Sequence, residues 1–256
     1  IFQTVEWRRY KMSMKLNCDL GESFGMWKMG LDEQVMPHID MANIACGFHA
    51  GDADVMANTL ALAKQHNVTV GAHPSYPDKQ GFGRRSMAMS AQELINCLHY
   101  QIAAIDGMAA VHGLTLNYVK PHGALYNDMM RDERILESVM RAVASYPKSL
   151  KLMILATNQA DKHKEHASAL NLELILEAFA DRQYTDEGTL VSRNLAGSVH
   201  DKPALIAQVK QLIKHGTVTT RSGQQLTLNA DSLCVHGDNE AGIALIQEIK
   251  TLCQQA

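Results

Sequence analysis

From Met14 onward the sequence repeats one unit, in which a short apolar segment ends in polar or glycine residues and an amphipathic segment follows. Strands that alternate with helices in this way are typical of a parallel sheet whose crossover connections are helical. The pattern predicts strands at residues 15–20, 42–46, 68–72, 117–120, 150–156, 172–179 and 232–235.

Helices are predicted between these strands. The clearest start is at Ser90, because Glu93 three residues later completes a capping box. One helix is expected to run from the turn at Gly123 to about Ser145, and a polar helix contains His163 and His166. The other predicted elements are helices at residues 53–65, 202–214 and 240–253, and a hairpin at residues 218–228.

Polar residues follow the strands rather than precede them, for at least five of the seven strands. In (β/α) barrels the loops at the carboxyl ends of the strands carry the active site, whereas a doubly wound open sheet concentrates its site at one switch point. The sequence therefore favours a single α/β domain over residues 14–256, folded as a distorted seven-stranded (β/α) barrel. Residues 1–13 precede the repeating pattern and are predicted to be an extension outside the fold.

Charge and cysteine content exclude several classes of protein. A formal net charge of −3 gives no electrostatic reason to expect binding to nucleic acid or to an anionic membrane. The five cysteines are scattered and form no CxxC pair. Such a set differs from a disulfide framework or a structural zinc site and is typical of a reducing compartment, so we expect a cytoplasmic protein.

The alternation of strand side chains selects the candidate catalytic residues. Lys120 and His122 share one face of their strand, and a lysine on an inward face is costly to bury unless an anion meets it. Cys18 and Cys46 have the opposite parity from the polar residues and are expected to be buried apolar side chains. The residues predicted to converge on one mouth of the barrel with Lys120 and His122 are Asp19, His49, His73, Glu177 and His236.

Four of these side chains could ligate a metal ion. Asp19, His49, His73 and His122 offer oxygen and nitrogen donors that zinc, manganese or iron accept. The sequence contains no HxH, HxxxH or HExxH pair, however. An acid/base and electrostatic role is therefore favoured, and a bound transition metal stays an open alternative.

The segment GFGRR places two arginines among glycines, where a planar guanidinium suits a carboxylate or phosphate. A solvated surface pair fits the segment equally well. The sequence contains neither a P-loop nor a dinucleotide-binding fingerprint. Substrate or phosphate binding is assigned to Asn17, Arg84, Arg85 and Asn127. Structural ion pairs are predicted in the loop after the sixth strand, among Asp181, Arg182, Asp186 and Arg193.

Six motifs carry a resemblance to a known family. They are NCDLGESFG, ANIACGFHAGD, GAHPSYPD with QGFGRR, VKPHGALYN, FADRQY and CVHGD, and they closely resemble the LamB/YcsF family in order and spacing. The resemblance implies a distorted barrel related to glycoside hydrolase/deacetylase folds. It also implies the A subunit of the prokaryotic 5-oxoprolinase, which opens the lactam of 5-oxo-L-proline (pyroglutamate) to L-glutamate. That activity uses ATP, with Mg²⁺, and is attributed to a complex with subunits B and C.

Roles for individual residues come from the chemistry. A lactam amide is unreactive, and phosphorylation of its oxygen makes attack by water feasible. Lys120 and the two arginines would bind the phosphate and the substrate carboxylate, and Asp19 or Glu177 would activate water. His122 or His73 would protonate the leaving nitrogen.

Two other functions stay open. A metal-dependent deacetylase or amidase of a sugar or small amide would use the same residues without ATP, with a metal at Asp19, His49 and His73. A non-catalytic scaffold that only supports its partners is disfavoured by the convergence of so many polar residues. The sequence also leaves open whether ATP binds this chain or an interface between subunits.

Overall fold

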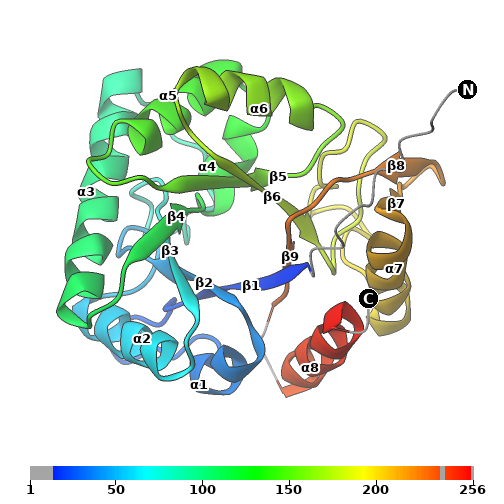
Figure 1. Ribbon diagram of the computed structural model, residues 1–256, viewed down its shortest axis with the longest axis horizontal. Coiled ribbons are helices and arrows are strands. Elements are labelled where there is room, and N and C mark those ends of the chain that lie inside the picture. Colours follow the sequence, from blue (N-terminus) through cyan, green and yellow to red (C-terminus); the bar gives the residue numbers. More distant parts are fainter. Residues whose placement is uncertain (1–13, 237–239, 255–256) are drawn as a thin grey trace, which may run out of the picture.

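The seven strands predicted from the sequence close into a parallel barrel in the computed structural model, which describes residues 14–236 and 240–254 (Figure 1). The last strand of the barrel pairs with both the first and the sixth, so the sheet has no free edge. The prediction of a single-domain, seven-stranded (β/α) barrel is confirmed. In barrel order the strands are β1 Lys15–Leu20, β2 Met41–Ala45, β3 Thr69–His73, β4 Leu116–Val119, β5 Lys151–Leu155, β6 Leu174–Phe179 and β9 Ser232–Cys234.

Helices surround the ring of strands (Figure 1). The predicted hairpin is present as β7 Thr217–Thr219 and β8 Gln225–Thr227, which pair antiparallel outside the barrel. No helix within the described residues is both long and apolar enough to cross a membrane. The helices are α1 Asp32–Val35, the 3-10 helix η1 Met36–His38, α2 Ala53–Gln65, α3 Ala91–Val111, α4 Gly123–Met129, α5 Glu133–Ala144, α6 Ala160–Ala169, α7 Lys202–His215 and α8 Glu240–Gln254.

Side-chain caps fix where the long helices begin. The Ser90 hydroxyl accepts from the Glu93 amide and the Glu93 carboxylate accepts from the Ser90 amide, which confirms the predicted capping box of α3. The Asp52 carboxylate caps α2 by accepting from the Val55 amide. These caps set the points at which the chain leaves the loops after β2 and β3.

The prediction of one helix from Gly123 to about Ser145 is wrong. The chain forms two helices, α4 and α5, separated by a turn at residues 130–132. The Asp132 carboxylate accepts from the Arg134 amide and so caps a new helix. Aspartate favours such caps over helix interiors because its short side chain competes for backbone amides. The predicted extension at residues 1–13 lies outside the described residues.

Apolar side chains fill two regions separated by the barrel wall. The main core lies between strands and helices and includes Cys18 and Cys46, as their parity predicts. A small cluster of Met41, Tyr118 and Met153 fills the barrel interior nearer the amino ends of the strands. Polar residues occupy the interior above it, toward the carboxyl ends of the strands.

Candidate active site

Lys120 lies at the centre of the polar interior, just beyond the end of β4. Its ammonium group is 2.6 Å from Glu177 Oε1 and 2.9 Å from Asp19 Oδ1. It also donates to Asn17 Oδ1 at 3.2 Å. The inward lysine inferred from strand parity is therefore confirmed, and the anions that stabilise it are two carboxylates from β1 and β6, the strands on either side of β9.

Burial and the neighbouring charges shift the pKa of Lys120 in opposite directions. Burial disfavours the ammonium form of Lys120, but the neighbouring carboxylates of Asp19 and Glu177 outweigh it, and the pKa of Lys120 is raised well above its usual range. Burial likewise disfavours the Asp19 carboxylate, and His73 and Lys120 reverse the effect, so the pKa of Asp19 is lowered. The site therefore holds a permanent cation next to an ionised aspartate.

Several residues that support this centre were not predicted from the sequence. Asn43 donates to both Asn17 Oδ1 and Asp19 Oδ1 at 2.8 Å, and accepts from the Tyr118 hydroxyl at 2.6 Å. Tyr126 donates to Glu177 Oε2 at 2.8 Å. Asn43 was detectable, because an asparagine inside an otherwise apolar strand must find hydrogen-bond partners.

A second polar group lies beside the first and contains three histidines. Glu22 Oε1 is 3.1 Å from His49 Nε2 and 3.4 Å from His122 Nδ1. His122 Nδ1 is in turn 3.0 Å from His73 Nε2, and the rings of His49 and His122 stack at 3.7 Å. The structure thus brings together the three predicted histidines, but with Glu22, which was not predicted, rather than with Asp19. Asp19 Oδ2 is 3.4 Å from His73 Nε2 and links the two groups.

The loop GFGRR contributes its backbone to this group. Phe82 O lies 2.9 Å from His122 Nε2, and Gly83 O accepts from the Ala124 amide at 2.8 Å. Gly83 has φ +64°, and a Cβ added there would lie 2.8 Å from both His49 Cβ and His122 Cδ2. Only glycine allows so close an approach, so this loop positions the histidine rings.

The two arginines of that loop differ in their surroundings. Arg85 Nε lies 3.0 and 3.1 Å from the two carboxylate oxygens of Asp78, and its guanidinium forms an ion pair with this carboxylate. The Arg84 guanidinium is exposed and lies 5.0 Å from the centre of the Phe82 ring. Asn127 is also exposed, and its amide donates to Gly123 O within α4. The Arg84 guanidinium, unlike that of Arg85, is therefore not paired with Asp78.

His236 and Asp181 form a pair beyond the ends of β9 and β6, close to Asp19. His236 Nδ1 is 3.0 Å from Asp181 Oδ2. Burial disfavours the charged imidazole, but the Asp181 carboxylate outweighs it, and the pKa of His236 is raised. The predicted structural ion pairs of this loop are therefore wrong in detail. Asp181 pairs with a site histidine, while the Arg182 guanidinium donates to the carbonyls of Val191 and Ser198.

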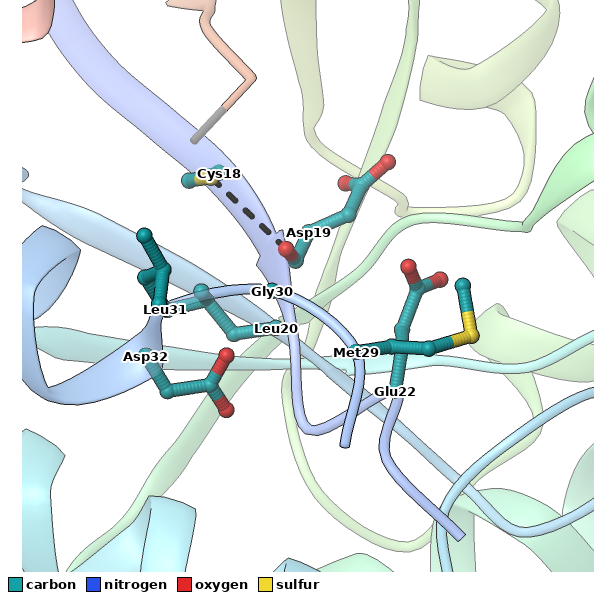
Figure 2. A pocket seen from close by; sticks show the side chains of 8 residues that line it. All are labelled: Cys18, Asp19, Leu20, Glu22, Met29, Gly30, Leu31 and Asp32. Carbon is teal, nitrogen blue, oxygen red and sulfur yellow. Dashed lines mark hydrogen bonds between the residues drawn. The ribbon is translucent and has the colours of Figure 1, made fainter. Parts of the chain in front are cut away.

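A small pocket of about 30 Å³ opens beside Asp19 near the end of β1 and Glu22 just after it (Figure 2). Asp19 and Glu22 line it together with residues 29–32. Asp32 Oδ2 accepts from the Gly21 amide at 2.8 Å and from the Thr59 hydroxyl at 3.2 Å, which anchors the turn between the two acids. A volume of this size holds about one water molecule.

The cysteines have the properties of buried apolar residues. Burial raises the pKa of Cys46 to about 12, and it raises the pKa of Cys18 well above the usual range. A thiol that stays protonated is a poor nucleophile. Cysteine attack is therefore not the chemistry that these residues support.

The loop after β1 exposes apolar side chains next to the mouth. Met26 is 98% exposed and Trp27 is 75% exposed, with Phe24 and Met29 partly exposed beside them. The loop is held to the next one, because Gly25 N donates to Asp52 Oδ2 and Gly51 N donates to Ser23 O. Several large, exposed apolar side chains within one short loop are typical of a surface that another molecule covers.

Known proteins resemble this chain over nearly its whole length. The 5-oxoprolinase A subunit of Vibrio parahaemolyticus is 50% identical over 241 residues, which cover 94% of this chain and 95% of that protein. A 5-oxoprolinase A subunit of Pseudomonas putida, the one numbered 2, is 52% identical over 236 residues, or 92% of each chain. The crystal structure of the lactam utilization protein from Thermus thermophilus matches with a TM-score of 0.86 at 35% identity, covering 95% of this chain and 97% of that one.

The sequence model of the LamB/YcsF family matches residues 14–256, a range that includes every strand of the barrel and both polar groups at its mouth. This match, together with relatives that are 50% and 52% identical, shows that the chain belongs to the LamB/YcsF family.

Proposed function

We propose that this chain is the A subunit of an ATP-dependent 5-oxoprolinase, which opens the lactam of 5-oxo-L-proline to L-glutamate together with the B and C subunits. The observation that carries the proposal is Lys120, a buried cation held between two carboxylates at the mouth of the barrel. The relatives, which are named as 5-oxoprolinase A subunits and as a lactam utilization protein, support the same substrate class.

The geometry suggests a division of roles. The exposed Arg84 is suited to an anion, namely the substrate carboxylate or a phosphorylated lactam oxygen. Lys120 is already paired with two carboxylates and holds Asp19 in place at the mouth. Asp19 is the better base for water, because its side chain is 19% exposed whereas Glu177 is fully buried and hydrogen-bonded to Tyr126. His236 is the better donor to the leaving nitrogen, because the pairing with Asp181 favours its protonated form.

Partner subunits enter the proposal for three reasons. The sequence has no phosphate-binding loop of the P-loop kind, although a stable amide calls for activation by ATP. The pocket beside Asp19 and Glu22 is about 30 Å³, the size of about one water molecule, so a bound lactam would extend beyond it toward surface that a partner subunit can cover. The relatives are named as one lettered subunit of an enzyme, which implies an assembly with other subunits.

The chain alone is expected to release little or no glutamate from 5-oxoproline, and to gain ATP-coupled turnover when the B and C subunits are added. Glutamate and ADP are measured with this chain alone, with B and C alone, and with all three mixed. Full turnover by this chain alone, or by B and C without it, contradicts the proposal.

The exposed apolar loop provides a further test of the assembly. Trp27→Ala is expected to raise the Kd for the B and C subunits by at least about tenfold, because buried tryptophans are among the largest contributors at protein interfaces. Val111→Ser is the matched control, since Val111 is 82% exposed but lies at the end of α3, away from the mouth. Binding is measured by calorimetry. Equal Kd values for Trp27→Ala and the unmodified chain would place the interface elsewhere.

A metal-dependent amidase is the second function that a specific observation supports, namely the convergence of Glu22 with three histidines. It differs in needing no ATP. Turnover of 5-oxoproline, or of a small amide, at the same rate with and without ATP would favour it. The relatives favour the ATP-dependent reaction.

A further inference from the structure

We propose that Glu22, His49, His73 and His122 form a binding site for one divalent transition-metal ion of the zinc type. One ligand atom from each residue lies within 4.8 Å of all the others. The inference concerns the isolated chain and does not depend on which reaction the assembled enzyme performs.

Two backbone carbonyls fix the direction of two imidazole lone pairs. His73 Nδ1 is 2.7 Å from Lys120 O, and His122 Nε2 is 2.9 Å from Phe82 O. A carbonyl oxygen can only accept, so each of these nitrogens carries a proton. In the neutral imidazoles the other nitrogens, His73 Nε2 and His122 Nδ1, therefore present lone pairs to the centre of the group. A second nitrogen hydrogen-bonded to a backbone carbonyl is the usual arrangement of metal-ligating histidines.

These lone pairs face each other at 3.0 Å. Two acceptors at this distance repel unless a proton or a cation lies between them. A shared proton needs only two partners, whereas four ligand atoms converge in this group. Glu22 Oε1 approaches both His122 Nδ1 and His49 Nε2, and supplies a negative charge. A cation satisfies all four atoms together, so the geometry favours it.

The spacing of the ligand atoms fits a small ion. Metal bonds of about 2.0 to 2.1 Å in a tetrahedral arrangement separate neighbouring ligand atoms by about 3.3 Å. The closest approaches in this group are 3.0 Å, 3.1 Å and 3.4 Å. Three imidazole nitrogens and one carboxylate oxygen match the preferences of Zn²⁺ and its first-row neighbours rather than those of Mg²⁺ or Ca²⁺.

The surroundings hold the ligands in place before an ion arrives. All three histidines are buried, and Gly83 leaves no room for His49 or His122 to move toward the loop. The His49 ring stacks on His122 with an angle of 2° between the planes. Rigid, buried donors of this kind raise affinity because little ordering remains to be done on binding. The ion would act as a Lewis acid next to Asp19, which lies 3.4 Å from His73.

The test measures metal content, not activity. The purified chain is dialysed against a chelator, reloaded with Zn²⁺ or Co²⁺, passed through a desalting column and analysed by mass spectrometry. We expect about one ion per chain, a visible absorption spectrum for the Co²⁺ form, and a higher Tm with metal than without.

Glu22→Gln and His49→Ala are each expected to weaken Zn²⁺ binding by at least about tenfold, since even an outer-shell partner is worth that much. His215→Ala is the matched control, because His215 is exposed at the end of α7. Glu22→Gln keeps the shape of the side chain, so it removes the negative charge of this ligand without creating a cavity. Circular dichroism checks that each variant is folded. Substoichiometric zinc in the unmodified chain, or unchanged zinc affinity in a folded Glu22→Gln, overturns the proposal.

Discussion

Replacing Lys120 by Met is expected to lower the free energy of unfolding by about 3 to 5 kcal/mol, the usual cost of removing one partner from a buried ion pair. The substitution leaves two carboxylates facing each other, Asp19 and Glu177, without the ammonium group between them. Turnover in the assembled enzyme is expected to fall by at least about a hundredfold, because a preorganised charge is lost. Stability is measured by urea unfolding and turnover by glutamate release.

Lys151→Met is the matched control for stability. Lys151 pairs with Glu173 at the opposite end of the barrel, and both side chains are largely exposed. The expected change is at most about 1 kcal/mol, because exposed pairs contribute little. Equal free energies of unfolding for Lys120→Met and Lys151→Met would show that the pairs of Lys120 with Asp19 and Glu177 contribute no more to stability than an exposed ion pair. Normal turnover in Lys120→Met would remove Lys120 from the active site.

Asp19→Asn is expected to reduce kcat by at least about a hundredfold while the chain stays folded. The asparagine oxygen can still accept from Asn43 and from Lys120, whose contacts with Asp19 Oδ1 are 2.8 and 2.9 Å. It cannot take a proton from water, which is the role assigned to this carboxylate. The measurement is the kcat for ATP-coupled glutamate release, with far-ultraviolet circular dichroism as a check on folding.

Asp40→Asn is the matched control for this substitution. Asp40 precedes β2, and its Oδ2 accepts from the Leu16 amide at the opposite end of the barrel. The asparagine can keep that hydrogen bond, so kcat is expected to stay within about twofold of normal, since surface substitutions away from special features have small effects. A normal kcat in Asp19→Asn would make Asp19 a structural residue and leave Glu177 as the base.

Strand parity predicted much of the site because both rules involved are geometric. Side chains alternate along a strand, and the strands of a parallel barrel end at one mouth. These rules place Asp19, Lys120 and Glu177 together, and the structure joins them by ion pairs. Asn43 obeys the same rule and lies opposite Asp19 in the register of β1 and β2.

Residues in loops escaped the same reasoning. Glu22 follows a turn at Gly21, which has φ +70°, so the alternation that holds in β1 no longer gives the direction of its side chain. Arg85 pairs with Asp78, seven positions earlier, because the loop folds back at Gly81. A pattern of residue types could not reveal either contact. Tertiary contacts decide how such loops are arranged, and the local sequence has only a weak influence on them.

Closure of the barrel has a consequence for the order in which the site forms during synthesis. β1 leaves the ribosome first, yet one of its two neighbours is β9, and the register joins Asn17 to Cys234. Until β9 emerges, β1 and β6 each keep an unpaired edge, and such edges invite aggregation. Until then the barrel wall beside Lys120 is also incomplete, because β9 supplies Cys234, whose Sγ lies 3.4 Å from the Lys120 ammonium group. A nascent chain therefore completes its polar interior only when nearly all of its residues are available. A chain that ends before Ser232 lacks the strand that joins β1 to β6, and with it Cys234 and His236.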